Sequence, residues 1–180
     1  MFSGKLVLFV LGWIVVTVFI KPSVGARMTF KAGDCTYNRS TFSNFSIQII
    51  KTKVLMDMIL VTTLRQGLKA HLSFEFRISK GKPYQSVYQH DMNYCALIKG
   101  SQESIYRRWF TSMLKVGNFA TSCPIREGYY YMHGWTLDAN NVPSFLYLGD
   151  YRIGGSFFYG RFKKQFYSPL LECSVEAVLN

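Results

Sequence analysis

The chain has 180 residues, with 21 Lys and Arg, 10 Asp and Glu, and a formal net charge of +11. This length allows one domain of ordinary size or two small ones. Apolar residues make up 49% and charged residues 17% of the chain, which excludes a disordered polyampholyte or a long coiled coil. The basic excess by itself does not exclude nucleic acid or anionic membranes as partners.

Residues 1–26 have the pattern of a secretory signal peptide. Lys5 precedes an uncharged run from Leu6 to Ile20, and Val24-Gly25-Ala26 offers small or β-branched residues where a signal peptidase reads. The run is shorter than the roughly 20 apolar residues of a spanning helix. We expect cleavage after Ala26, with an uncleaved signal anchor as the alternative. The mature protein is then secreted and extracellular, with a single domain over residues 27–180.

The four cysteines become candidates for disulfide bonds if the chain is secreted. Four cysteines allow three pairings, and sequence alone does not choose among them. Their spacing is unlike that of a zinc finger, so we expect no metal site. Sequons for N-glycosylation begin at Asn38 and Asn44, and we expect a glycan on at least one of them, at the surface. The cysteines are Cys35, Cys95, Cys123 and Cys173.

Alternation of polar and apolar residues predicts a mainly β chain. Lys69 to Ser79 alternates throughout, which predicts a strand with one buried face and with His71 pointing outward. The β-rich run from Val54 to Leu64 is predicted to form a hairpin with it, through a turn at Gln66-Gly67. With further strands expected at 45–49, 84–88 and 171–177, the pattern predicts an antiparallel β-sandwich.

One segment has the period of a helix. Ser101 can cap an amphipathic helix over about residues 101–117, with Ile105, Trp109 and Met113 on its apolar side. We expect this helix to interrupt an otherwise all-β chain.

An ordered set of short motifs fills the second half of the chain. They are Asp91-Met92-Asn93-Tyr94-Cys95, Gly117-Asn118-Phe119, Cys123-Pro124-Ile125, Gly128-Tyr129-Tyr130, Val142-Pro143 and Gly149-Asp150-Tyr151-Arg152. In this order they resemble a large insect family of secreted proteins of unknown function, which includes the fly CheB-type chemosensory proteins. That family is distantly similar to the ganglioside activator and other ML-type lipid-recognition proteins. The resemblance covers roughly residues 35–178.

The resemblance implies an immunoglobulin-like (ML-like) sandwich whose two sheets separate to admit an apolar ligand. It implies a secreted carrier or accessory protein that is not an enzyme, linked to pheromone or taste sensing, whose partner is a lipid or another small hydrophobic molecule. We also expect a monomer and no cofactor. The resemblance also implies disulfide bonds between Cys35 and Cys173 and between Cys95 and Cys123.

A pocket between the sheets is therefore the main candidate site. Aromatic residues suit such a pocket because they supply rigid apolar area, with a polar tip on Tyr. The same residues could instead fill an ordinary core, and the protein would then act through its surface on a membrane receptor or channel. The candidates are Leu72, Phe74, Phe76, Ile78, Trp109, Met113, Tyr129, Tyr131, Phe157 and Tyr159.

The short basic clusters at Lys80-Gly81-Lys82, Arg107-Arg108 and Arg161–Lys164 give a weaker signal. They could meet anionic headgroups or an acidic receptor face, but charges that keep the protein soluble explain them better. The secretory route and the lack of a nucleic-acid-binding motif argue against nucleic acid. No catalytic motif occurs in the sequence and its acidic residues are dispersed, so we do not expect an enzyme.

Overall fold

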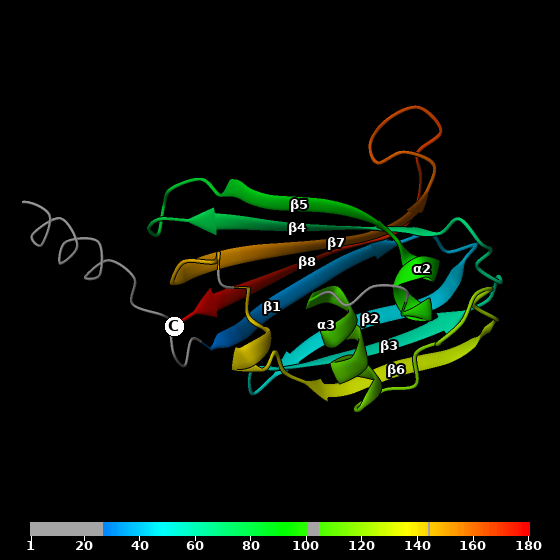
Figure 1. Cartoon of the computed structure of the whole chain (residues 1–180), viewed down its shortest axis with the longest axis horizontal. Helices are drawn as coiled ribbons and strands as arrows, with labels where there is room; N and C mark the ends of the chain where they lie inside the picture. Colours follow the sequence, from blue (N-terminus) through cyan, green and yellow to red (C-terminus); the bar gives the residue numbers. More distant parts are fainter. Residues whose placement is uncertain (1–26, 101–104, 144) are drawn as a thin grey trace, which may run out of the picture.

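The computed structural model describes residues 27–100, 105–143 and 145–180. Within these ranges eight strands form two antiparallel sheets that face each other, with two short α-helices beside them (Figure 1). The protein is therefore a mainly β sandwich with a little helix, as the alternating sequence predicted. The expected signal peptide, its cleavage after Ala26 and the capping residue Ser101 lie outside the described residues.

The two sheets differ in size. The large sheet has the strand order β1-β8-β7-β4-β5, and the small sheet has the order β2-β3-β6. The strands are β1 (Met28–Tyr37), β2 (Phe42–Ile50), β3 (Lys53–Leu60), β4 (Lys69–Arg77), β5 (Gln85–Asn93), β6 (Gly128–Trp135), β7 (Gly149–Tyr159) and β8 (Ser168–Leu179).

The sheets are joined along one side and bridged by helices along the other. On the joined side, the edge strands β1 and β2 follow each other in sequence and lie against each other. On the opposite side, α2 (Tyr94–Lys99) contacts β4 and β5, and α3 (Ile105–Leu114) contacts β6 (Figure 1). The helices thus cover the space between the other two edge strands.

The inner faces of both sheets share one apolar core. Pairs of residues that lie opposite each other in an antiparallel ladder point to the same face, so Phe74 with Ile153 and Phe76 with Tyr151 face the small sheet. The largest fully buried side chains are Tyr151, Phe42, Phe74, Phe158, Leu60, Leu68 and Leu179.

Two disulfide bonds reinforce this arrangement, and they join the pairs that the resemblance implied. Cys35 in β1 is bonded to Cys173, its register partner in β8. Cys95 in α2 is bonded to Cys123 in the segment that leads to β6. In the chain-entropy picture, closures of 138 and 28 residues stabilise the fold by up to about 5 and 4 kcal/mol.

The predicted hairpin between 54–64 and 69–79 is wrong. β3 pairs with β2 and β6 in the small sheet, whereas β4 pairs with β5 and β7 in the large sheet. The chain between them crosses from one sheet to the other and buries Leu64 and Leu68 on the way. Alternation identifies a strand with one buried face, but it does not say to which sheet the strand belongs.

The helix prediction is correct for only part of its range. Described helical residues of that segment form α3, which ends at Leu114, before the expected end. The preceding helix α2 was not predicted, because six residues are too few for a clear helical period. Asn93 caps it by accepting a hydrogen bond from the backbone N–H of Ala96. No helix in the described part of the chain is long and apolar enough to cross a bilayer.

Candidate ligand-binding cavity

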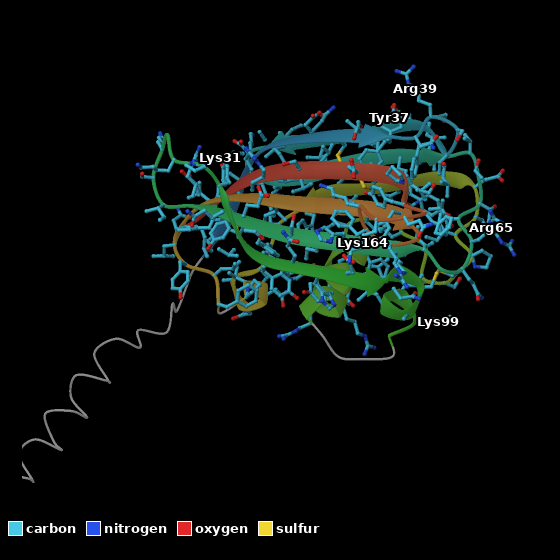
Figure 2. The ribbon with its side chains drawn as sticks, turned by 90° about the horizontal axis from the view of Figure 1, so that it is seen from above. Lys31, Tyr37, Arg39, Arg65, Lys99 and Lys164 are labelled. Atoms are coloured by element: carbon cyan, nitrogen blue, oxygen red, sulfur yellow. A yellow bond between two sulfur atoms is a disulfide. The ribbon has the colours of Figure 1, made fainter. Side chains whose placement is uncertain are left out.

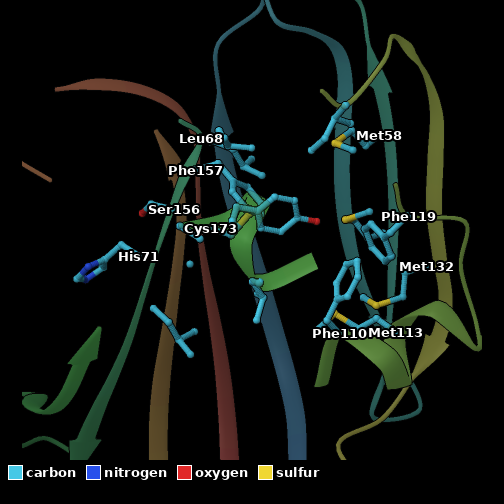
Figure 3. A pocket seen from close by; sticks show the side chains of 18 of the residues that line it. Met58, Leu68, His71, Phe110, Met113, Phe119, Met132, Ser156, Phe157 and Cys173 are labelled. Atoms are coloured by element: carbon cyan, nitrogen blue, oxygen red, sulfur yellow. The ribbon is translucent and has the colours of Figure 1, made fainter. Parts of the chain in front are cut away.

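A cavity of about 310 Å³ lies between the two sheets, on the side that the helices cover (Figure 3). Both sheets and both helices contribute to its wall. The lining residues are Phe42, Phe45, Ile47, Met56, Met58, Leu64, Leu68, Ala70, His71, Leu72, Met92, Tyr94, Leu97, Tyr106, Trp109, Phe110, Met113, Phe119, Ile125, Met132, Gly155, Ser156, Phe157, Leu171 and Cys173.

The wall of the cavity is almost entirely apolar. None of its lining residues, within the described ranges, is Asp, Glu, Lys or Arg. Figure 3 shows the side chains of His71 and Ser156 directed away from the cavity, so these two residues border it from the far side of the large sheet. The hydroxyls of Tyr94 and Tyr106 are therefore the polar side-chain groups of the wall that a ligand in the cavity would meet first.

Gly155 contributes to the open space beside the large sheet. It lies opposite Leu72 in the ladder between β4 and β7, on the inner face. A Cβ atom built at Gly155 would meet nothing within 4 Å. A residue without a side chain thus leaves open space where neighbouring positions of the sheet carry Leu72 and Phe157.

Methionines form much of the opposite wall and the helical side. Met56, Met58 and Met132 come from the small sheet, and Met113 comes from α3. Figure 3 shows Met113 and Met132 on the same side of the cavity as Phe110 and Phe119, with Met58 further along this wall. Because methionine is flexible and polarizable, this wall can adapt to the shape of an apolar ligand.

Tyr94 stands at the start of α2 and is 9% exposed. Its ring packs edge-on against Phe110 and Phe157, at centroid distances of 6.1 and 5.0 Å. Burial raises the pKa of the Tyr94 phenol, with a smaller contribution from Tyr130, so the hydroxyl stays protonated. No described residue forms a hydrogen bond with this hydroxyl.

Tyr106 and Trp109 present polar groups that already have partners. The Tyr106 hydroxyl is hydrogen-bonded to the hydroxyl of Tyr88 in β5. Burial, followed by this hydrogen bond, raises the pKa of Tyr106. Trp109 donates its indole N–H to the carbonyl oxygen of Asn141 at 2.7 Å, which ties α3 to the loop after β6.

The structure brings four of the ten predicted pocket residues together at the cavity. Leu72 and Phe157 border it from the large sheet, and Trp109 and Met113 border it from α3. The other six predicted residues lie elsewhere, for two different reasons.

The first reason is position along the large sheet. Phe74 is 1% exposed and packs against Trp109 beside the cavity, so it belongs to the core. Phe76 packs against Tyr151, with ring centroids 5.2 Å apart, further toward the end of β4. Ile78 follows the last residue of β4 and is 75% exposed, because the strand has ended before it.

The second reason is that the side chain is directed away from the cavity. Tyr159 is the last residue of β7, and its hydroxyl accepts a hydrogen bond from the backbone N–H of Arg65. Tyr129 and Tyr131 are on the outer face of the small sheet, because Tyr130 and Met132 take the inward positions of β6. Six of the predicted lining positions are thus corrected, and the alternation in β6 was assigned to the wrong face.

The outer face of the small sheet carries a polar aromatic cluster around Asp57. Tyr129 donates a hydrogen bond to Asp57 Oδ1, and His133 Nε2 lies 2.9 Å from the same oxygen. The Tyr131 ring lies between those of Tyr129 and His133, at 5.8 and 4.9 Å. The hydrogen bond from Tyr129, followed by that from His133, lowers the pKa of Asp57 and the former raises the pKa of Tyr129.

His71 was predicted to be exposed, but it is 7% exposed. Its side chain does point to the outer face of the large sheet, yet the loop after β7 covers that face. The Phe162 ring stacks on the His71 ring at 3.7 Å, and His71 Nδ1 lies 2.5 Å from Asp91 Oδ1. Alternation in a strand predicts on which face of the sheet a residue lies, but it does not predict that a loop covers that face.

The basic residues labelled in Figure 2 are spread over the molecule. Lys31 lies toward one end, Arg39, Arg65 and Lys99 lie toward the other, and Lys164 lies over the middle. In the described ranges, no three His, Cys, Asp or Glu side chains are grouped as a metal ion would require.

Both sequon asparagines are exposed. The Asn38 Oδ1 accepts hydrogen bonds from the backbone N–H and the hydroxyl of Ser40 in the turn between β1 and β2. Asn44 lies in β2 opposite Ile59, on the outer face of the small sheet. Either asparagine is open to modification.

The sequence reasoning missed most of the cavity wall. Phe45 and Ile47 alternate in β2, and Met56 and Met58 alternate in β3, so the pattern could have identified these inward positions. Tyr94 carried no such signal, because its position depends on where α2 begins.

The fold and the cavity together define a β-sandwich with an apolar site between its sheets. Residues 70–153 match the family described as "Protein of unknown function (DUF1091)". The matched segment extends from β4 into β7 and contains both helices and Tyr94. No curated protein matches the sequence.

Proposed function

We propose that the protein is a secreted binding protein that encloses a small hydrophobic molecule, such as a lipid or a pheromone-like compound, between its sheets. The apolar cavity of about 310 Å³ is the observation that carries this proposal. Its volume lies at the lower end of the roughly 300–1,000 Å³ typical of small-molecule sites.

The chemistry of the wall favours an apolar ligand over water. Buried water needs about two to four polar partners, and apolar cavities stay dry or take up apolar molecules. Transfer of an alkyl chain from water into such a site is favourable by about 0.8 kcal/mol per buried CH₂ group. Enclosure of the ligand would thus be driven by desolvation.

Two features support a secreted protein. Cys35–Cys173 and Cys95–Cys123 are disulfide bonds of the kind that persist in oxidising compartments. Asn38 and Asn44 are exposed, as acceptors of N-glycans must be. A role in chemosensation, which the resemblance to the fly CheB-type proteins suggests, belongs to the same proposal.

Titration with an apolar fluorescent dye tests the proposal. The purified protein should bind a naphthylamine dye with saturation at one site, and aliphatic compounds should displace it competitively. Dye fluorescence that does not saturate, or that aliphatic compounds do not displace, would contradict a ligand-binding cavity.

The second candidate is a surface-interaction protein that contacts a membrane receptor or channel. Large apolar side chains are exposed near one end of the large sheet: Ile78 is 75%, Tyr147 72% and Leu148 62% exposed. The pairing of Arg77 with Asp150 places Ile78 and Leu148 at the same end of β4 and β7. Lys80 and Lys82 are exposed in the adjacent turn. Without dye binding, this end would be the site to examine.

A further inference from the structure

We infer that the ligand of the cavity carries one uncharged oxygen function, as a long-chain alcohol, ester or ketone does, which accepts a hydrogen bond from the Tyr94 hydroxyl. This inference rests on the proposed function. It assigns the class of ligand and the residue that distinguishes that class.

Tyr94 is held firmly in place. Its backbone N–H donates to the carbonyl oxygen of Leu68 at 3.0 Å, and Asn93 caps the helix that it begins. The next residue, Cys95, is bonded to Cys123. Because its ring also packs against Phe110 and Phe157 of the cavity wall, the hydroxyl has a defined position at the site.

The Tyr94 hydroxyl has no hydrogen-bond partner among the described residues, and its oxygen is not one of their fully buried unpaired atoms. Because Tyr94 lines the cavity and is only 9% exposed, this hydroxyl is accessible to a molecule that enters the cavity. Polar groups at such sheltered positions are usually hydrogen-bonded, so the unpaired hydroxyl favours a partner that is not part of the chain. Tyr106, the other tyrosine of the wall, shows the ordinary case, since its hydroxyl is bonded to Tyr88. A ligand oxygen would give the Tyr94 hydroxyl a hydrogen-bond partner in the same way.

The remaining wall restricts the charge of that oxygen. No Lys or Arg of the described ranges lines the cavity, so a carboxylate would lose its hydration without gaining a counter-ion. A plain hydrocarbon, in turn, would leave the Tyr94 hydroxyl unpaired. An uncharged acceptor on an apolar chain satisfies both conditions.

The test compares three compounds of equal chain length: dodecane, dodecanol and dodecanoate at pH 8. Each displaces the apolar dye from wild type, from Tyr94→Phe and from Tyr106→Phe. Tyr106→Phe is the matched control, because it removes a hydroxyl of the same wall that already has a partner. Thermal unfolding of each variant establishes that it is folded.

We expect Tyr94→Phe to weaken dodecanol binding by about threefold to tenfold, the range of one neutral hydrogen bond, and to leave dodecane binding unchanged. Tyr106→Phe should alter the affinities for dodecane and dodecanol by the same factor. Dodecanoate should bind more weakly than dodecanol to wild type.

Equal effects of Tyr94→Phe on dodecanol and dodecane, or a preference of wild type for dodecanoate, would overturn the inference while dye binding still supports the cavity. Failure of wild type to bind the dye and all three compounds would overturn the proposed function itself.

Discussion

Leu72 in β4 lies directly opposite Gly155 in β7, so one strand of the pair carries an inward side chain and the other carries none. A Cβ at Gly155 would meet no atom within 4 Å, and both residues border the cavity. The absence of a side chain at Gly155 therefore leaves part of the space between the sheets open.

Gly155→Leu should fill part of the cavity and abolish dye binding. The backbone at Gly155 needs no glycine conformation, and glycine in a strand interior is destabilising by roughly 0.5–1 kcal/mol. The variant should thus be at least as stable as wild type. Dye titration and thermal unfolding measure the two effects.

Ser156→Leu is the matched control for that variant, because it introduces the same side chain at the next position of β7, where the side chain points away from the cavity (Figure 3). It should retain dye binding. Loss of binding in both variants, or retention in Gly155→Leu, would mean that the cavity is not the binding site.

The two disulfide bonds should affect binding differently. Loss of either one should destabilise the fold by about 2–5 kcal/mol. The bond between Cys95 and Cys123 anchors α2 at the cavity, so replacing both residues by Ser should also weaken dye affinity. Replacing Cys35 and Cys173 by Ser loosens β1 from β8, away from the helices, and puts a hydroxyl in place of the sulfur of Cys173 in the cavity wall. It should weaken dye affinity less than the loss of the bond that anchors α2. A larger loss of dye affinity in the second pair would contradict the role assigned to α2.

Asp57 should contribute stability that disappears in acid. Its hydrogen bonds from Tyr129 and His133 place its native pKa below the ordinary 3.8, so the carboxylate stabilises the fold above that pH. The contribution is lost as the pH falls through the native pKa. Asp57→Asn should therefore lower the free energy of unfolding near neutral pH, by an amount that shrinks below pH 4. A difference from wild type that is the same at pH 7 and pH 3 would argue against this account.

Much of the fold was predictable, and the reasons for the errors are physical. Alternation identified β4 from Lys69 onward, because one face of an antiparallel strand is buried. It could not assign β3 and β4 to separate sheets, since that depends on which strand each one pairs with. It also could not foresee that Phe162 would cover His71.

The site was harder to predict than the fold. Leu72, Trp109 and Met113 lie on faces that periodicity marks as apolar, and all three border the cavity. Periodicity does not distinguish a residue that borders a cavity from one, such as Phe74, that is packed on all sides. Leu72 borders the cavity in part because its partner Gly155 has no side chain to fill the space beside it. The sequence pattern does not reveal this effect.

Expression through the secretory pathway should add glycans at the exposed sequons. At least one of Asn38→Gln and Asn44→Gln should remove one glycan mass, and dye affinity should stay the same in both because neither asparagine borders the cavity. Intact-mass spectrometry before and after enzymatic deglycosylation measures this. Secreted protein with the unmodified mass at both sites would contradict the expectation.

The most direct test of the central claim is mass spectrometry of organic extracts from the purified, secreted protein, with Gly155→Leu prepared in parallel. The account predicts an apolar compound with an uncharged oxygen function that co-purifies with wild type and is absent from Gly155→Leu. Extracts of the two proteins with the same content, or a wild-type extract without any apolar compound, would contradict it.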